Sequence, residues 1–185
     1  DFIRHAGFPK ICEIGFGNGC TLQHLAQNLP QLESLVGLEI NEEQVRSQRA
    51  ANSDNRISYI HTQCTSEYIS QNDFSDTVFV TSSTYVCCIP EAVHDLIGAI
   101  GKHPNTGVFF QEPVNYDVLT AEHSEERAYV EEFQSSFKMY SHPYFHLLDT
   151  FGFEVWDAFI EPVDIKTLYY DNITVSALQP RSLLP

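Results

Sequence analysis

The chain has 185 residues and carries 25 acidic against 10 basic side chains, so its formal net charge is −15 at pH 7. A chain this acidic repels phosphate backbones and anionic lipid headgroups, which argues against nucleic acid and membrane surfaces as partners. The length fits one domain, which we expect to span residues 1–185, and an apolar content of 43 % is sufficient for a packed core.

The cysteines and the longest apolar runs bear on the compartment. The five cysteines are an odd number and form no C-x-x-C pair. This pattern favours a reduced, cytoplasmic setting in which most of them are small buried hydrophobes. No apolar run in the sequence approaches the roughly 18–20 residues that a membrane-spanning helix needs.

Apolar runs alternate with helical patterns through the first half of the chain. This alternation is typical of βαβ units around a mostly parallel sheet. Asn41 is a good N-cap for one of the helices, with Gln44 at the capping-box position, and Pro90 suits the first turn of a later one. We expect strands at Lys10–Ile14, Ser34–Ile40, Arg56–His61, Thr77–Thr81 and Gly107–Gln111.

The segment Val114–Ser141 interrupts this order. It is polar and acidic, and it is much longer than the roughly 2–6 residues of a usual connection, so we predict an insertion there. Its second half carries a helical pattern, which predicts one helix. The residues of that pattern are Ala128, Val130, Phe133 and Phe137.

The regular order resumes after the insertion. Pro143 is expected to open a helix that ends at Gly152, a natural C-cap. Two long β patterns follow, Phe153–Ile160 and Thr167–Leu178, and the short segment between them allows a hairpin. One of the last strands should therefore run antiparallel to the rest of the sheet.

Three glycines directly follow the first strand. Gly15, Gly17 and Gly19 let the backbone approach a ligand, and the helix behind them offers free N–H groups. In the dinucleotide fingerprint G-x-G-x-x-G the third glycine would stand where Cys20 is, which argues against a pyrophosphate ligand. Glu39 ends the second strand about 20 residues further on, where a carboxylate can accept both hydroxyls of a ribose. The two features together predict a nucleoside site.

These residues resemble the motifs of class I S-adenosylmethionine-dependent methyltransferases. Ile11–Gly19 is similar to the first motif and Gly37–Asn41 to the second. Asp76–Ser83 resembles the fourth-strand motif, and Leu168–Val175 resembles the last strand. The resemblance implies an α/β, Rossmann-like fold: a mostly parallel sheet of seven strands with the last strand antiparallel and helices on both faces.

The resemblance also implies how S-adenosylmethionine would bind as cofactor. Its methionine part would lie against the Gly15–Gly19 loop, its ribose on Glu39 and its adenine on Ile40. Gln63, beside Cys64, stands where the family often has an acidic residue, and its amide oxygen can accept the same adenine hydrogen bond. The expected cofactor-binding residues are Glu13, Gly15, Phe16, Gly17, Gly19, Glu39, Ile40, Gln63, Cys64, Thr81 and Ser82.

The end of the fourth strand restricts the methyl acceptor. Thr81–Thr84 reads T-S-S-T, unlike the Asn/Asp-Pro-Pro-aromatic motif of enzymes that methylate base or glutamine nitrogens. It also lacks the acidic residue with which catechol-type enzymes bind magnesium, so no metal site is predicted. We expect in-line, metal-independent methyl transfer to a small-molecule acceptor.

The acceptor side of the site is expected where the fourth and fifth strands end. Tyr85, Glu112 and His142 are the candidate catalytic residues, and His5 is a further candidate base. Cys87 and Cys88 belong either to the acceptor pocket or to the core. The insertion carries aromatic residues that either roof a partly apolar acceptor or pack against its own helix. These are Tyr116, Tyr129, Phe133, Phe137 and Tyr140.

Two other readings stay open. A methyltransferase-like binding module without turnover would keep the same glycine loop, and production of S-adenosylhomocysteine (SAH) from a panel of acceptors separates it from an enzyme. A nicotinamide dehydrogenase is disfavoured by Cys20, and titration with NAD tests it.

Overall fold

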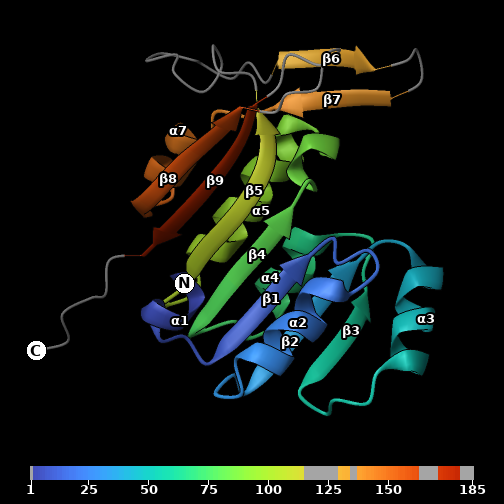
Figure 1. Ribbon diagram of the computed structural model, residues 1–185. Coiled ribbons are helices and arrows are strands. Elements are labelled where there is room, and N and C mark those ends of the chain that lie inside the picture. The colour runs from blue at the N-terminus through green and yellow to red at the C-terminus, as the bar shows by residue number, and fades with distance from the viewer. Residues whose placement is uncertain (1, 115–128, 134–136, 163–170, 180–185) are drawn as a thin grey trace, which may run out of the picture.

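The computed structural model describes residues 2–114, 129–133, 137–162 and 171–179, and its core is a seven-stranded sheet (Figure 1). The strand order is β3-β2-β1-β4-β5-β9-β8. Strand β9 pairs antiparallel with both of its neighbours, and the pairs among β1 to β5 are parallel. The predicted sheet, with its last strand antiparallel, is confirmed. The strands are β1 (Lys10–Ile14), β2 (Ser34–Glu39), β3 (Ile57–His61), β4 (Thr77–Ser82), β5 (Gly107–Val114), β8 (Glu154–Pro162) and β9 (Asp171–Leu178).

Helices cover both faces of the sheet, as expected, and each face has its own apolar core. On one face, residues of α1, α2 and α3 pack together with side chains of β1 to β4. On the other face, α4, α5 and α7 pack against the same strands and β9. The helices are α1 (Phe2–Ala6), α2 (Cys20–Asn28), α3 (Glu42–Ala51), α4 (Thr65–Gln71), α5 (Pro90–Gly101) and α7 (Tyr144–Thr150), with a short 3-10 turn, η1 (Tyr85–Cys87). Helix α1 was not anticipated from the sequence.

The residues predicted to begin or end helices stand where they were expected, but the capping box at Asn41 does not form. The side chain of Asn41 accepts hydrogen bonds from the amides of Glu43 and Gln44, so it caps α3. The amide of Asn41, which a capping box would pair with Gln44, instead donates to the carboxylate of Glu39. Pro90 stands at the start of α5, and Gly152, with a φ of 75°, follows the end of α7.

The prediction of a helix in the second half of the insertion is wrong for the residues that the structure describes. Tyr129–Phe133 forms β6 and Phe137–Ser141 forms β7, and the two strands pair antiparallel. Aromatic and β-branched residues favour strands, and Phe133 pairs directly with Phe137 across the two strands. The remaining residues of the insertion, 115–128 and 134–136, lie outside the described residues, and Tyr116 is among them.

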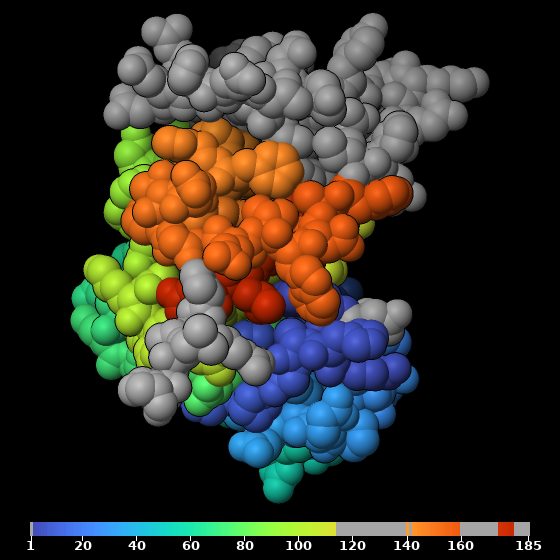
Figure 2. All heavy atoms as spheres, turned by 90° about the vertical axis from the view of Figure 1, so that its left-hand side faces the viewer, coloured from blue at the N-terminus to red at the C-terminus, as the bar shows by residue number. Residues whose placement is uncertain are grey.

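Strand β8 forms one edge of the sheet and faces the viewer with α7 in Figure 2. Trp156 is 54 % exposed and Phe159 is 60 % exposed, and a bulge interrupts the pairing with β9 between Val155 and Asp157. The predicted start of the last strand, residues 167–170, lies outside the described part of the chain. Among the described residues, no helix combines the length and the apolar character that crossing a membrane requires.

Candidate functional site

The carboxyl ends of β1 and β4 lie at the point where the strand order reverses. Strand β1 has β2 as its neighbour on one side and β4 as its neighbour on the other side. In open α/β sheets ligands bind outside the carboxyl ends of the strands at such a point. The loop after β1, Gly15–Gly19, and the loop after β4, Ser83–Ile89, both begin there.

The three glycines of the first loop serve different purposes. All three have positive φ, at 70° for Gly15, 51° for Gly17 and 69° for Gly19. A Cβ on Gly15 would lie 2.7 Å from Cγ2 of Thr84, and one on Gly19 would lie 2.9 Å from the hydroxyl of Tyr59. A Cβ on Gly17 would meet no atom within 4 Å. Two glycines are therefore needed for packing, and Gly17 faces open space.

The carboxylate of Glu39 is held by three backbone amides. Its Oε2 accepts from the amide of Gly17 at 3.2 Å, and its Oε1 accepts from the amides of Ile40 at 2.9 Å and Asn41 at 3.0 Å. A carboxylate accepts about four hydrogen bonds, so roughly one position stays open. A ligand with two hydroxyls would therefore share or displace the contact with Gly17.

The ends of β2 and β3 form an exposed wall beside Glu39. The side chain of Ile40 is 62 % exposed, which suits a residue that packs on a flat ring. His61 was not anticipated, and its Nε2 donates to the carbonyl of Ile40 at 3.1 Å. The amide of Gln63 lies 3.1 Å from the same nitrogen, and Cys64 is exposed at the start of α4. The structure thus brings Ile40, Gln63 and Cys64 to one side of the loop.

The side chains of two residues of the first motif, Glu13 and Phe16, are buried beneath the backbone of the loop. Glu13 is buried against the first turn of α2, and its Oε2 has no hydrogen-bond partner among the described residues. Burial raises the pKa of Glu13 to about 7, although the hydroxyl of Thr21 and the amide of Leu22 lower it. Phe16 packs on Tyr59 with 4.8 Å between ring centroids, so it belongs to the core.

Glu112 is fully buried and fastens the loop after β4. Its Oε1 accepts from the hydroxyl of Thr81 and from the amide of Thr84, both at 2.9 Å, and its Oε2 accepts from the amide of Val86 at 3.2 Å. Burial raises the pKa of Glu112, and these hydrogen bonds oppose that rise. Thr81 is buried by the same contact, whereas Ser82 is exposed.

Tyr85 belongs to this loop, and its side chain and that of His142 are both buried. The ring of Tyr85 packs on Phe110 and Tyr144, and burial raises the pKa of its phenol well above the usual value. His142 Nε2 donates to the carbonyl of Tyr85 at 2.8 Å, and burial lowers the pKa of the imidazole. The three candidate catalytic residues are therefore brought together, but as supports of the loop. Cys87 is exposed and Cys88 is half-buried.

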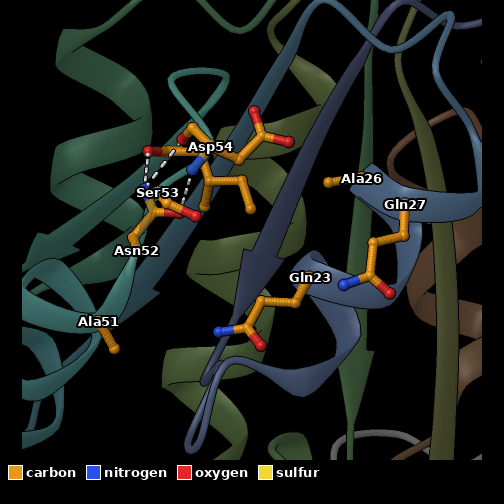
Figure 3. Close-up of a pocket in the computed structure, with 8 residues that line it drawn as sticks. Gln23, Ala26, Gln27, Ala51, Asn52, Ser53 and Asp54 are labelled. Carbon is orange, nitrogen blue, oxygen red and sulfur yellow. Dashed lines mark hydrogen bonds between the residues drawn. The ribbon is translucent and has the colours of Figure 1, made fainter.

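A groove of about 280 Å³ lies away from these strand ends (Figure 3). Gln23 and Gln27 of α2 line one side of it, and Asn52 and Asp54 line the other, near the start of β3. Asn52 donates to the carbonyls of Asp54 and Ile57, both at 3.0 Å, so its amide stabilises the turn.

Within the described part of the chain, no three His, Cys, Asp or Glu side chains are grouped to hold a metal ion.

No family model and no curated protein matches the chain. A S-adenosylmethionine-dependent methyltransferase from Methanosarcina mazei has a similar structure, with a TM-score of 0.69 and 16 % identity over 96 % of each chain. The N-terminal domain of EvdMO1 with SAH bound has a TM-score of 0.66 at 14 % identity, over 97 % of this chain and 78 % of that one. The cyclase SpnF has a TM-score of 0.66 at 12 % identity, over 94 % and 76 %. The chain thus has the Rossmann-like fold of class I S-adenosylmethionine-dependent methyltransferases, as its motifs predict.

Proposed function

We propose that the protein binds S-adenosylmethionine and transfers its methyl group to a small molecule. The observation that carries this proposal is the pairing of Gly17 with Glu39 at the sheet's switch point. Gly17 leaves open space for a ligand, and Glu39 supplies a carboxylate beside that space. A structural neighbour with SAH bound, EvdMO1, supports the choice of ligand.

The described residues fit that cofactor. The positive end of the α2 dipole, which follows the glycine loop, suits the carboxylate of its methionine part. Glu39 suits the ribose, and the exposed side chain of Ile40 suits the adenine ring. Gln63 and Cys64 lie at the edge of the same wall. Glu13, buried beneath the loop, acts on the cofactor through the position of the loop.

The cofactor supplies an activated methyl group and its own leaving group when it is bound. The task left to the protein is to align the acceptor and to exclude water. Glu112 and His142 hold the loop after β4 as a fixed wall for that alignment. Because both residues and Tyr85 are buried, we propose that they position this wall and transfer no proton. An acceptor with a weakly held proton needs no base.

The acceptor is proposed to be small and partly apolar, and the insertion Val114–Ser141 is proposed to help select it. We propose metal-independent transfer, which predicts turnover that survives EDTA. All five cysteines are free thiols, which supports a reduced, cytoplasmic setting. We also propose that residues 1–185 form one domain.

A methyltransferase-like module without methyl transfer is the second candidate, because the cyclase SpnF has the same fold. Calorimetric titration with S-adenosylmethionine, SAH and NAD tests the site, and we expect binding of the first two only. Release of SAH in the presence of an acceptor panel then tests turnover. Binding without release under any acceptor would favour the module.

A further inference from the structure

Strand β8 is an edge of the sheet, and no strand lies on its outer side among the described residues. Figure 2 shows this edge, in orange, at the surface of the molecule. From Asp157 to Pro162 the strand pairs with β9 without interruption, so its outer side presents a regular row of backbone hydrogen-bonding groups. Strands β4, β5 and β9 separate β8 from β1 and its glycine loop, so the proposed methyl transfer does not use this edge.

One face of β8 is open to a partner. Phe109 of β5, Ser176 of β9 and Asp157 of β8 are partners in register, so their side chains share the sheet face on which α1 packs. Phe159, two residues after Asp157, lies on the same face and is more than half exposed. The apolar core on this face includes no residue of β8 among the described residues. The helices that cover β1 to β4 therefore leave this part of the sheet uncovered.

Trp156 extends the open face at the bulge of β8. Its ring centroid lies 5.2 Å from that of Phe2 in α1, and the ring of Phe2 lies 6.1 Å from that of Phe109. The indole is nevertheless more than half exposed. Edge strands that avoid association carry charged residues or proline, whereas exposed aromatic residues are enriched at protein interfaces. The aromatic content of β8 therefore favours an edge that binds a partner.

The charges on β8 indicate what kind of partner fits. Glu154 and Asp157 are exposed, and neither carboxylate forms an ion pair with another described residue. The sequence Glu154–Pro162 contains no lysine, arginine or histidine, and Arg4 of α1 lines a groove toward α2. Two copies of the chain joined at this edge would bring carboxylates together, which opposes a dimer. A basic segment would instead be attracted to the carboxylates and to the face of the indole.

We propose that the outer edge of β8 binds an extended, basic segment of another protein, which adds to the sheet as a further strand. Lysine or arginine side chains of that segment would lie on the face of α1, against Trp156, Glu154 and Asp157. Alternate apolar side chains would lie on the other face, beside the exposed Val155 and Ala158. This interaction goes beyond the proposed methyl transfer and does not depend on it.

The test follows the fluorescence of Trp156, the only tryptophan of the chain, in the intact protein without S-adenosylmethionine. A failure of methyl transfer therefore leaves the result unaffected. The probe is a short capped peptide of alternating lysine and valine. One counterpart has glutamine in place of lysine, and the other has proline in place of valine, so it keeps the charge but cannot pair as a strand. We expect the lysine–valine peptide to shift the emission to shorter wavelength, because it removes water from the indole, and to bind at least about tenfold more tightly than either counterpart.

Variants locate the binding. The exposed pair Glu154→Gln/Asp157→Asn should raise the Kd of the lysine–valine peptide by about tenfold or more. The matched pair Glu42→Gln/Glu43→Gln on α3 makes the same charge change away from β8 and should leave the Kd unchanged. Equal effects of the two pairs, equal binding of the probe and either counterpart, or no emission shift would overturn the proposal. A dimer in sedimentation that Phe159→Asp dissociates would also overturn it, because a second copy would then occupy the edge.

Discussion

The amide of Gly17 donates to Oε2 of Glu39 across 3.2 Å, so the glycine loop and the end of β2 are joined before any ligand binds. The same carboxylate holds the first two residues of the next loop through Ile40 and Asn41. Backbone amides thus already hold the Glu39 carboxylate of the proposed cofactor site in place. A ribose hydroxyl that binds Glu39 would take the place of the Gly17 amide as hydrogen-bond donor to the carboxylate.

Replacement of Glu39 by alanine should weaken S-adenosylmethionine binding by about 2–4 kcal/mol, since charge-assisted hydrogen bonds to the ribose are lost. Calorimetric titration measures the change. Glu42→Ala, an exposed neighbour on α3, is the control and should alter affinity by less than about 0.5 kcal/mol. A Glu39→Ala loss as small as that of the control would show that Glu39 only organises the backbone.

Gly17→Ala should abolish cofactor binding while the protein still folds. The new methyl group meets no protein atom within 4 Å, so only the positive φ of 51° opposes folding. That strain costs about 1–2 kcal/mol. Gly7→Ala is a matched control, because Gly7 has a φ of 71° and equally open space. We expect the two variants to have comparable free energies of unfolding, and only Gly17→Ala to lose its affinity for the cofactor. If Gly17→Ala kept that affinity, the ligand would bind elsewhere.

The buried carboxyl of Glu13 should make stability depend on pH. Its pKa is about 7 in the folded protein, against an ordinary pKa of 4.5 for a glutamate, so the folded state holds this proton more tightly. The stabilisation is present at low pH and is lost as the pH rises from about 4.5 to 7. Its upper limit is about 3.5 kcal/mol, because the pKa rises by about 2.5 and each pKa unit corresponds to roughly 1.4 kcal/mol.

Urea unfolding at a series of pH values measures this loss. Glu13→Gln should remove it, so the variant gains stability relative to the parent protein between pH 5 and pH 8, values chosen to bracket the shift. Glu33→Gln, at an exposed position, should leave the profile of the parent unchanged. Parallel profiles for Glu13→Gln and the parent would refute the raised pKa.

Glu112→Ala should destabilise the protein by about 3–5 kcal/mol, because the amides of Thr84 and Val86 and the hydroxyl of Thr81 lose their acceptor. Glu112→Gln keeps one acceptor oxygen and should lose less. Thermal unfolding gives the stability order. In the turnover assay, Glu112→Gln should lower kcat without changing its pH profile, as expected of a positioning residue. Loss of one limb of the profile would instead make Glu112 a base.

The sequence predicts the strands of the parallel sheet, the glycine loop and the helix cap at Asn41, because each of these features is determined by residues close together in the chain. It does not reveal the burial of Glu112, since its partners Thr81 and Thr84 are 31 and 28 residues away and two of the contacts use backbone amides. The same holds for His142, whose partner is a carbonyl 57 residues earlier. The hairpin of β6 and β7 was missed because its aromatic spacing also fits a helix.

The antiparallel strand β9 also constrains the order of folding. It lies between β5 and β8, and in the described residues β8 has no other strand beside it. Until Asp171–Leu178 has been synthesised, β5 is therefore an open edge and β8 has nowhere to dock. Chain segments made first begin to fold first, and unpaired strand edges promote aggregation. Nascent chains that stop before β9 should therefore depend on chaperones far more than the finished protein does.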